Sequence, residues 1–330
     1  VYVELRQMGL DITHLDVGGG LGVDYDGTNS ESDSSVNYSL QEYANDVVYT
    51  LAEACREHEL PMPHLISESG RALTAHHALL LLKVIDVESH EVRELPDLTE
   101  DDHALLHEMV TDHRDVSRKN VSRRRVREIY HDLTFDKERA QELFNSGVLS
   151  LRGRAIAERV YFATLNLIAR HVERHRKDFE DISNDLGASL VDRYFCNFSV
   201  FQSLPDSWAI DQLFPIVPIH RLDEQPTRRA TIQDVTCDSD GKIDRFVGAK
   251  GGSQSLEVHE PRDGEAYMLG VFLTGAYQEI LGDLHNLFGD TNAVHIRLNG
   301  NGGYSVTDLV HGDTVTEVLN YVQFRGADLL

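Results

Sequence analysis

The feature that most constrains this fold is a run of glycines placed directly after a short apolar strand. Residues 12–17 predict the strand, and the string GGGLG at positions 18–22 follows it at once. Consecutive glycines leave backbone N–H groups uncovered by side chains, so such a loop can wrap around an anion, although an isolated run is as often a tight turn. A Rossmann fingerprint does not fit, because its third glycine position holds Val23 or Tyr25, and the chain contains no GxxxxGK[ST] loop.

A second strand follows after one helix. Apolar residues between positions 40 and 60 recur with the 3.6-residue period of an amphipathic helix, prolines at 61 and 63 end it, and Leu65-Ile66 predicts the strand. This alternation of strand, helix and strand indicates parallel pairing, so both strands should end at the same edge. Glu68 and Arg71 follow the second strand and should therefore lie near the glycines. The arginine suits a phosphate group, whereas a surface Glu–Arg ion pair is the alternative.

The remainder of the chain changes character twice. Residues 99–190 show apolar positions at helical spacing, with charged residues between them and almost no glycine or proline, which predicts a helical bundle inserted into the chain. From about residue 193 the pattern returns to short strands, with hairpin signals at Asp240-Gly241 and Asn299-Gly300. We therefore expect three domains, covering residues 1–90, 91–190 and 191–330. The apolar stretch 78–87 predicts a buried strand or helix.

Charge and composition exclude several classes of function. The 330 residues contain 31 lysines and arginines against 55 aspartates and glutamates, which gives a formal net charge of -24. Such a surface repels nucleic acid and anionic lipid, and no apolar run reaches the roughly 18 residues that a membrane-spanning helix needs. The three scattered cysteines predict neither a disulfide framework nor a zinc site, and they favour a location in the reducing cytoplasm.

Longer strings along the chain resemble one enzyme family. LDVGGGLGVDY at 15–25 and ESGR at 68–71 are followed by NFSVFQSLPDSW at 197–208, DQLFP at 211–215, TCDSDG at 236–241, GAYQEILG at 275–282 and HNLFGD at 285–290. These strings are similar to those of the biosynthetic arginine decarboxylases, which are pyridoxal-phosphate (PLP) enzymes related to ornithine and diaminopimelate decarboxylases. The resemblance implies an α/β fold plus a β domain: the last strands of a PLP-binding (β/α)8 barrel, the helical bundle as an insertion, and a C-terminal β-barrel or sandwich.

The resemblance also implies a role for each matched position. The PLP phosphate would be bound by the backbone of Gly18, Gly19 and Gly20. Gly70, Arg71 and the hydroxyl of Tyr277 would contribute to the same site. Glu68 would pair with the pyridinium nitrogen, because a protonated ring is the better electron sink when CO₂ departs. Cys237 would return a proton to Cα, and Asp238 would contact the substrate. Without the resemblance, Cys237 and Tyr277 would be interpreted as ordinary core residues.

The same resemblance implies the substrate and the assembly. Ornithine decarboxylase-like relatives carry Asn-Asp-Gly where this chain has Asn197-Phe198-Ser199, which argues against the shorter diamino acids and for L-arginine, with agmatine and CO₂ as products. The substrate guanidinium would then pair with a carboxylate among Asp206, Asp238 and Asp240. Because the Cys-Asp pair of this family reaches into the neighbouring subunit, a homodimer or higher homo-oligomer with shared active sites is implied. Mg²⁺ is implied as a further cofactor, at a site that no matched residue marks.

One part of the family's chemistry has no counterpart among the matched strings. The six lysines include none in the context of the Schiff-base lysine, so we expect the chain to be a fragment, or otherwise a pseudoenzyme, and to be inactive alone. The histidine pairs 103/107 and 171/175 have a spacing that suits a metal, but solvated helix faces are the favoured interpretation. The arginines at 123–125 and 127 predict a salt-bridged helix face and no nucleic-acid site.

Three interpretations follow from the sequence. The first is an arginine decarboxylase involved in polyamine biosynthesis, of which this chain is the C-terminal half. The second is a related decarboxylase that acts on another basic or diamino acid, namely ornithine, lysine or diaminopimelate. The third is a non-catalytic partner of the same fold that binds an intact enzyme through the dimer surface. A Schiff-base lysine elsewhere in the gene product would favour the first two interpretations. A substrate profile would then distinguish arginine from the other amino acids.

Overall fold

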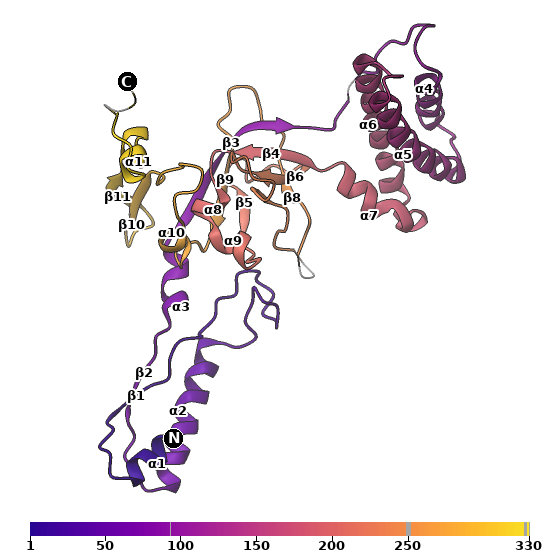
Figure 1. Cartoon of the computed structure of the whole chain (residues 1–330). Helices are drawn as coiled ribbons and strands as arrows, with labels where there is room; N and C mark the ends of the chain where they lie inside the picture. Colours follow the sequence, from indigo (N-terminus) through magenta and orange to yellow (C-terminus); the bar gives the residue numbers. More distant parts are fainter. Residues whose placement is uncertain (93, 249–251, 327–328, 330) are drawn as a thin grey trace. The chain divides into compact units, whose positions relative to one another are not determined.

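The computed structural model describes residues 1–92, 94–248, 252–326 and 329 (Figure 1). The chain divides into two compact units. Unit 1 comprises Val1–Asp86, Tyr194–Thr227 and Thr231–Leu330, and unit 2 comprises Val87–Arg193 and Arg228–Ala230. Among the described residues, no helix combines the length and the apolar character that crossing a membrane requires.

The N-terminal part of unit 1 alternates helices with two short strands. Its elements are α1 (Tyr2–Gln7), β1 (His14–Asp16), α2 (Leu40–Glu57), β2 (His64–Ile66), α3 (Gly70–Thr74) and the 3₁₀ turn η1 (Ala75–His77). Strands β1 and β2 pair in parallel, with Leu15 opposite Leu65, as the alternation predicts. Helix α2 begins with a capping box between Ser39 and Glu42 and ends at Glu57, before the two prolines.

The C-terminal part of unit 1 is built on a larger sheet. Its strands are β3 (Leu79–Glu88), β4 (Asp192–Cys196), β5 (Ile216–Pro218), β6 (Arg228–Gln233), β7 (Lys242–Ile243), β8 (Leu256–Val258) and β9 (Met268–Phe272). Their order is β5-β9-β3-β4-β6-β7, with β8 also paired to β6. The pairs β3–β9, β5–β9 and β6–β7 are antiparallel, and the last is the hairpin that Asp240-Gly241 predicts.

The apolar stretch 78–87 forms strand β3, but the expectation that it is buried holds for one face only. Leu82 and Val84 are buried, whereas Leu79, Leu81 and Ile85 on the opposite face are exposed. Successive side chains of a strand point to opposite faces of the sheet, so a fully apolar strand exposes every second residue where one face lacks a covering layer. The uninterrupted run of leucines therefore does not by itself indicate a strand covered on both sides.

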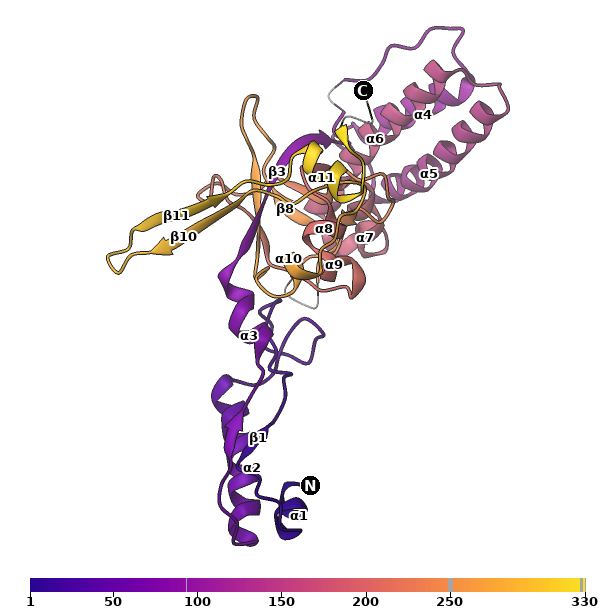
Figure 2. The ribbon, with the colours of Figure 1, turned by 60° about the vertical axis from the view of Figure 1, so that its left-hand side comes forward.

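Short helices and a separate hairpin complete unit 1. The remaining elements are α8 (Val200–Ser203), α9 (Pro205–Ala209), α10 (Gln278–Leu281), β10 (Ala293–Leu298), β11 (Tyr304–Val310) and α11 (Val315–Tyr321). Strands β10 and β11 form an antiparallel pair of their own, visible as the long hairpin of Figure 2. Its turn contains Asn299-Gly300, as the sequence predicts.

Unit 2 is a helical bundle. Its elements are α4 (Ala104–Val116), α5 (Arg123–Asn145), α6 (Leu151–Arg174), the 3₁₀ turn η2 (Arg176–Asp178) and α7 (Glu180–Ser189). Helices α4, α5 and α6 pack against one another around a continuous apolar core that includes Met109, Ile129, Leu165 and Ile168. Serine side chains cap the N-termini of α5 and α6, which satisfies backbone N–H groups that the helices leave unpaired.

The arginine cluster at the start of α5 faces acidic neighbours, as predicted. Arg124 pairs with Glu128 at 2.7 Å, Arg123 with Asp178 at 3.0 Å and Arg127 with Asp181 at 3.1 Å. The cluster is thus a salt-bridged surface of the bundle.

Candidate active site

The two loops that follow β1 and β2 lie side by side. Val17 donates its backbone N–H to the carbonyl of Ile66 at 2.9 Å, and Glu68 donates its N–H to the carbonyl of Gly18, also at 2.9 Å. The parallel pairing therefore continues past the last strand residues and brings the glycine loop next to Glu68. This is the juxtaposition that the sequence predicts for an anion-binding edge.

The glycine loop has a backbone that other residues adopt only with strain. Gly18 and Gly20 have φ values of +77° and +92°, and a Cβ added at either position would meet no atom within 4 Å. The glycines are thus needed for conformation, and the space beside them is open. Gly18 donates its N–H to the Asp16 carboxylate at 2.8 Å. In the described structure the N–H groups of Gly19 and Gly20 have no such partner, so they are the loop's free donors for an anion.

Arg71, three residues after Glu68, contacts three segments that are distant in the sequence. It lies on the short helix α3, and its side chain is about three-quarters buried, with 26% exposed. Its guanidinium donates to the hydroxyl of Tyr25 at 3.2 Å, lies 3.9 Å from the carboxylate of Asp206, and sits 4.6 Å from the centre of the Tyr277 ring. The predicted alternative, an ion pair with Glu68, is absent among the described residues. A guanidinium has five N–H donors, so this arrangement leaves donors available for an anion.

Asp206 is itself held by a reciprocal pair of hydrogen bonds. The side-chain nitrogen of Gln278 donates to the Asp206 carboxylate at 2.8 Å, and the backbone N–H of Asp206 donates to the Gln278 side-chain oxygen at 3.1 Å. Both side chains are buried. A carboxylate that is buried, hydrogen-bonded and adjacent to an arginine is well placed to fix the direction of that guanidinium.

Tyr25 completes the support of Arg71 from the other side. Its side chain is buried, and its ring packs edge-on against Phe214 with 5.4 Å between the ring centres. Burial raises the pKa of the Tyr25 hydroxyl, in opposition to the hydrogen bond and charge of Arg71, which lower it. The hydroxyl therefore stays neutral over the physiological range and accepts the Arg71 hydrogen bond as an uncharged partner.

Tyr277 occupies a strained backbone position next to Arg71. Its φ is +68°, a left-handed conformation that is uncommon for a bulky residue and that clusters at functional sites. The residue directly precedes α10, and the same turn brings Gln278 into contact with Asp206. The ring contacts the Arg71 guanidinium while 45% of the residue remains exposed.

Cys237 and Asp238 lie on an exposed loop between β6 and β7. The buried carboxylate of Asp234 shapes this loop: it accepts hydrogen bonds from the backbone and hydroxyl of Thr236, at 2.9 and 2.7 Å, and from the backbone of Val200 at 2.9 Å. The thiol of Cys237 is 3.9 Å from the side-chain nitrogen of Asn286. The described contacts do not join Cys237 to the cluster around Arg71.

The three carboxylates considered as partners of a substrate guanidinium differ in their surroundings. Asp206 is buried and already lies beside Arg71 and Gln278. Asp238 and Asp240 are exposed, and the Asp238 carboxylate accepts a hydrogen bond from the backbone of Asp240 at 2.9 Å. The surroundings of Asp206 favour a positioning role toward Arg71, which leaves the two exposed carboxylates as candidates for the substrate.

Two supporting residues, Tyr25 and Gln278, were not assigned a role from the sequence. Both lie inside strings that carry the family resemblance, so a signal was present. Lys83 lies on β3 with an exposed side chain, and Lys250 lies outside the described residues. The Mg²⁺ expectation stays a prediction, and the described residues contain no group of three or more His, Cys, Asp or Glu placed to hold one ion.

Two known protein families match separate parts of the chain. Residues 1–75 match the family described as pyridoxal-dependent decarboxylase, pyridoxal binding domain, and residues 99–187 match the arginine decarboxylase helical bundle domain. The biosynthetic arginine decarboxylases of Phocaeicola vulgatus and Nostoc sp. are 48% and 47% identical to the chain, in each case over all of it, with 51% and 48% of the relative covered. The chain is similar to the biosynthetic arginine decarboxylases along its whole length. It spans about half the length of the curated relatives it matches.

Solved structures extend the comparison to the fold. The biosynthetic arginine decarboxylase of Campylobacter jejuni is 34% identical, with a TM-score of 0.79 over 99% of this chain and 52% of that one. The diaminopimelate decarboxylase of M. jannaschii is 14% identical, with a TM-score of 0.53 over 99% of this chain and 46% of that one. The chain thus shares the fold of these decarboxylases.

Proposed function

We propose that the gene product containing this chain is a PLP-dependent decarboxylase that converts L-arginine to agmatine and CO₂. The observation that carries the proposal is that Glu68, three residues before the Arg71 cluster, is hydrogen-bonded to the open glycine loop, in a chain that resembles this family. Free N–H groups at Gly19 and Gly20 and the spare donors of Arg71 suit a phosphate dianion. The left-handed glycine backbone leaves room for it, so these residues fit the phosphate of PLP.

Most of the predicted residues then have a defined task, whereas the N–H of Gly18 is taken up by Asp16. Gly19, Gly20, Arg71 and the Tyr277 hydroxyl bind the phosphate, while Asp206 holds the direction of Arg71. Glu68, exposed beside the glycine loop, supplies a carboxylate for the pyridinium nitrogen. When bound, PLP supplies an electron-withdrawing ring that stabilises negative charge at Cα as the carboxylate leaves as CO₂.

The exposed loop at Cys237 serves the other half of the reaction. After the bond from Cα to the carboxylate carbon breaks, Cα holds an electron pair and needs a proton to become the methylene group of agmatine. The accessible Cys237 thiol can donate that proton, and Asp238 or Asp240 can pair with the substrate guanidinium. The family resemblance implies that the Cys-Asp pair reaches into a neighbouring subunit, and we further propose a homodimer in which this loop completes the partner's site.

The test is a decarboxylation assay of the complete gene product with carboxyl-labelled arginine, ornithine, lysine and diaminopimelate. We expect labelled CO₂ from arginine alone. Arg71→Gln should weaken PLP affinity by roughly 10- to 100-fold, because a charge-assisted contact to phosphate is lost. Arg56→Gln is the matched control, since Arg56 is exposed on α2 and its ion pair with Glu53 spans 3.9 Å. Equal PLP affinity in both variants, or CO₂ from another substrate, would refute the proposal.

A further inference from the structure

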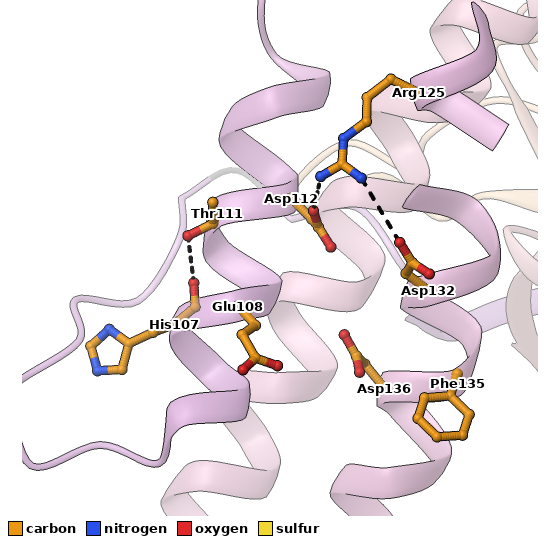
Figure 3. A pocket seen from close by; sticks show the side chains of 8 residues that line it. All are labelled: His107, Glu108, Thr111, Asp112, Arg125, Asp132, Phe135 and Asp136. Carbon is orange, nitrogen blue, oxygen red and sulfur yellow. Dashed lines mark hydrogen bonds and ion pairs between the residues drawn. The ribbon is translucent and has the colours of Figure 1, made fainter. Parts of the chain in front are cut away.

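A pocket of about 470 Å³ lies between α4 and α5 of the bundle (Figure 3). Four carboxylates line it in two facing pairs: Asp112 with Asp132, and Glu108 with Asp136. Within each helix the two acidic residues are four positions apart, so the two pairs are separated by about one helical turn, roughly 6 Å. We call them the Asp112–Asp132 pair and the Glu108–Asp136 pair.

The Asp112–Asp132 pair already contains a cation. The guanidinium of Arg125 lies 2.6 Å from the Asp112 carboxylate and 3.9 Å from that of Asp132, and Figure 3 shows it between the two. The same guanidinium also contacts Asp115 at 3.1 Å and Glu128 at 4.0 Å. One guanidinium thus contacts four carboxylates, and none of its ion pairs is with the Glu108–Asp136 pair.

The Glu108–Asp136 pair faces the same pocket without a cation. In the described part of the chain, neither carboxylate has an ion pair or a hydrogen bond. Asp136 is only 9% exposed, and its carboxylate points into the pocket toward Glu108 (Figure 3). Most of the Asp136 side chain is thus buried while its carboxylate faces the pocket beside a second carboxylate, and a cation or a proton in the pocket would offset this negative charge.

Most of the groups around Asp136 raise the pKa of its carboxyl. Burial raises its pKa to about 6, with further contributions from the negative charges of Glu108 and Asp112 on α4 and of Asp132 on α5, while Arg139 on α5 opposes them. Near pH 6 the group is therefore half protonated. A cation that binds beside Asp136 would therefore compete with this proton.

The geometry favours an organic cation over a metal ion. The described residues contain no group of three or more ligands placed around one ion, whereas the pair of carboxylates repeats the setting of Arg125 one turn away. Phe135 lines the same pocket with its ring exposed, which offers an apolar and cation-attracting surface to a ligand's carbon chain. We propose that the Glu108–Asp136 pair binds the positively charged head of a small organic ligand, an alkylguanidinium or an alkylammonium group.

The experiment measures binding to the complete gene product by calorimetry, with butylguanidinium, butylammonium and Mg²⁺ as probes. Hydrogen exchange of α4 and α5 locates the site. We expect one of the two organic cations to bind at one site per chain, to protect both helices, and to release protons at pH 5.5, because a bound cation favours the ionised form of Asp136.

Variants decide whether the pocket is responsible. Asp136→Asn and Glu108→Gln should each weaken organic-cation binding by about tenfold or more, since each removes a charge-assisted contact, and Asp136→Asn should abolish the proton release. Glu138→Gln, which removes an equal charge from an exposed position of α5, is the matched control and should bind like the wild type. Absent binding, binding unchanged in both pocket variants, or protection of the two helices by Mg²⁺ alone would overturn the proposal.

Discussion

Replacing Asp136 by asparagine should make the protein more stable at neutral pH. The pKa of this carboxyl is raised from 3.8 to about 6, first by burial and then by the neighbouring carboxylates. In the unfolded chain the group returns to its ordinary pKa, so between these two values the folded state binds the proton more tightly. The contribution of Asp136 to the free energy of unfolding is therefore fully present below about pH 4 and is lost as the pH rises through about 6.

The size of the effect follows from the two pKa values. Their difference sets an upper limit of about 3 kcal/mol on the stability lost at pH 7 and above, where Asp136 is ionised in both states, and solvent in the pocket screens part of it. Asparagine keeps the shape of the carboxyl group and carries no charge at any pH. Asp136→Asn should therefore match the wild type near pH 4 and exceed it by up to about 3 kcal/mol at pH 7.5.

Urea unfolding at pH 4.5 and 7.5 measures this difference. The helical signal at 222 nm reports on the bundle together with the helices of unit 1, and hydrogen exchange of peptides from α5 isolates the local effect. Glu138→Gln controls for a change in net charge at an exposed position of the same helix. An identical pH dependence in the wild type and in Asp136→Asn, or a less stable variant at pH 7.5, would show that the carboxylate has a partner at neutral pH and that the reasoning is wrong.

Three further predictions concern the candidate active site. Asp206→Asn should weaken PLP affinity by about 3- to 10-fold, because Arg71 loses the charge that orients it, and titration of the apoprotein with PLP measures this. Gly20→Ala should cost about 1–2 kcal/mol in thermal unfolding through its left-handed backbone, whereas Gly70→Ala, at a position with open space and ordinary backbone, should not. Cys237→Ala should leave PLP affinity unchanged while it slows turnover or diverts product toward the aldehyde; unchanged kinetics with an unchanged product would remove the proton-donor role.

Local patterns were sufficient for much of the fold. The helical period over 40–60 predicted α2, and its boundaries follow from the capping box and from the prolines beyond Glu57. The strand–helix–strand alternation predicted the parallel pair, and this pairing placed Glu68 beside Gly18 before any coordinates were needed. These features rest on periodicity and turn chemistry, which act over a few residues.

Contacts between distant segments were not predictable in the same way. The bond from Arg71 to Tyr25 joins residues 46 positions apart, and Asp206 and Tyr277 contact the same guanidinium from other elements. Nothing in a local pattern indicates that an aspartate will orient an arginine of the same chain. The sequence therefore suggested Asp206 as one partner of a substrate guanidinium, whereas its surroundings favour the guanidinium of Arg71.

The helical spacing of the buried residues in α5 contains a signal for the acidic pocket. The buried face of α5 follows Ile129, Leu133 and Ala140, and Asp136 falls on the same stripe at helical spacing. An aspartate at a position that the pattern assigns to the core is a signal that the sequence itself contains, because an ionised side chain is seldom buried without a partner. Because this helix carries many exposed charges, that signal does not stand out in the sequence. Asp136 differs from the neighbouring acidic residues of α5 because its helical position lies on the buried face.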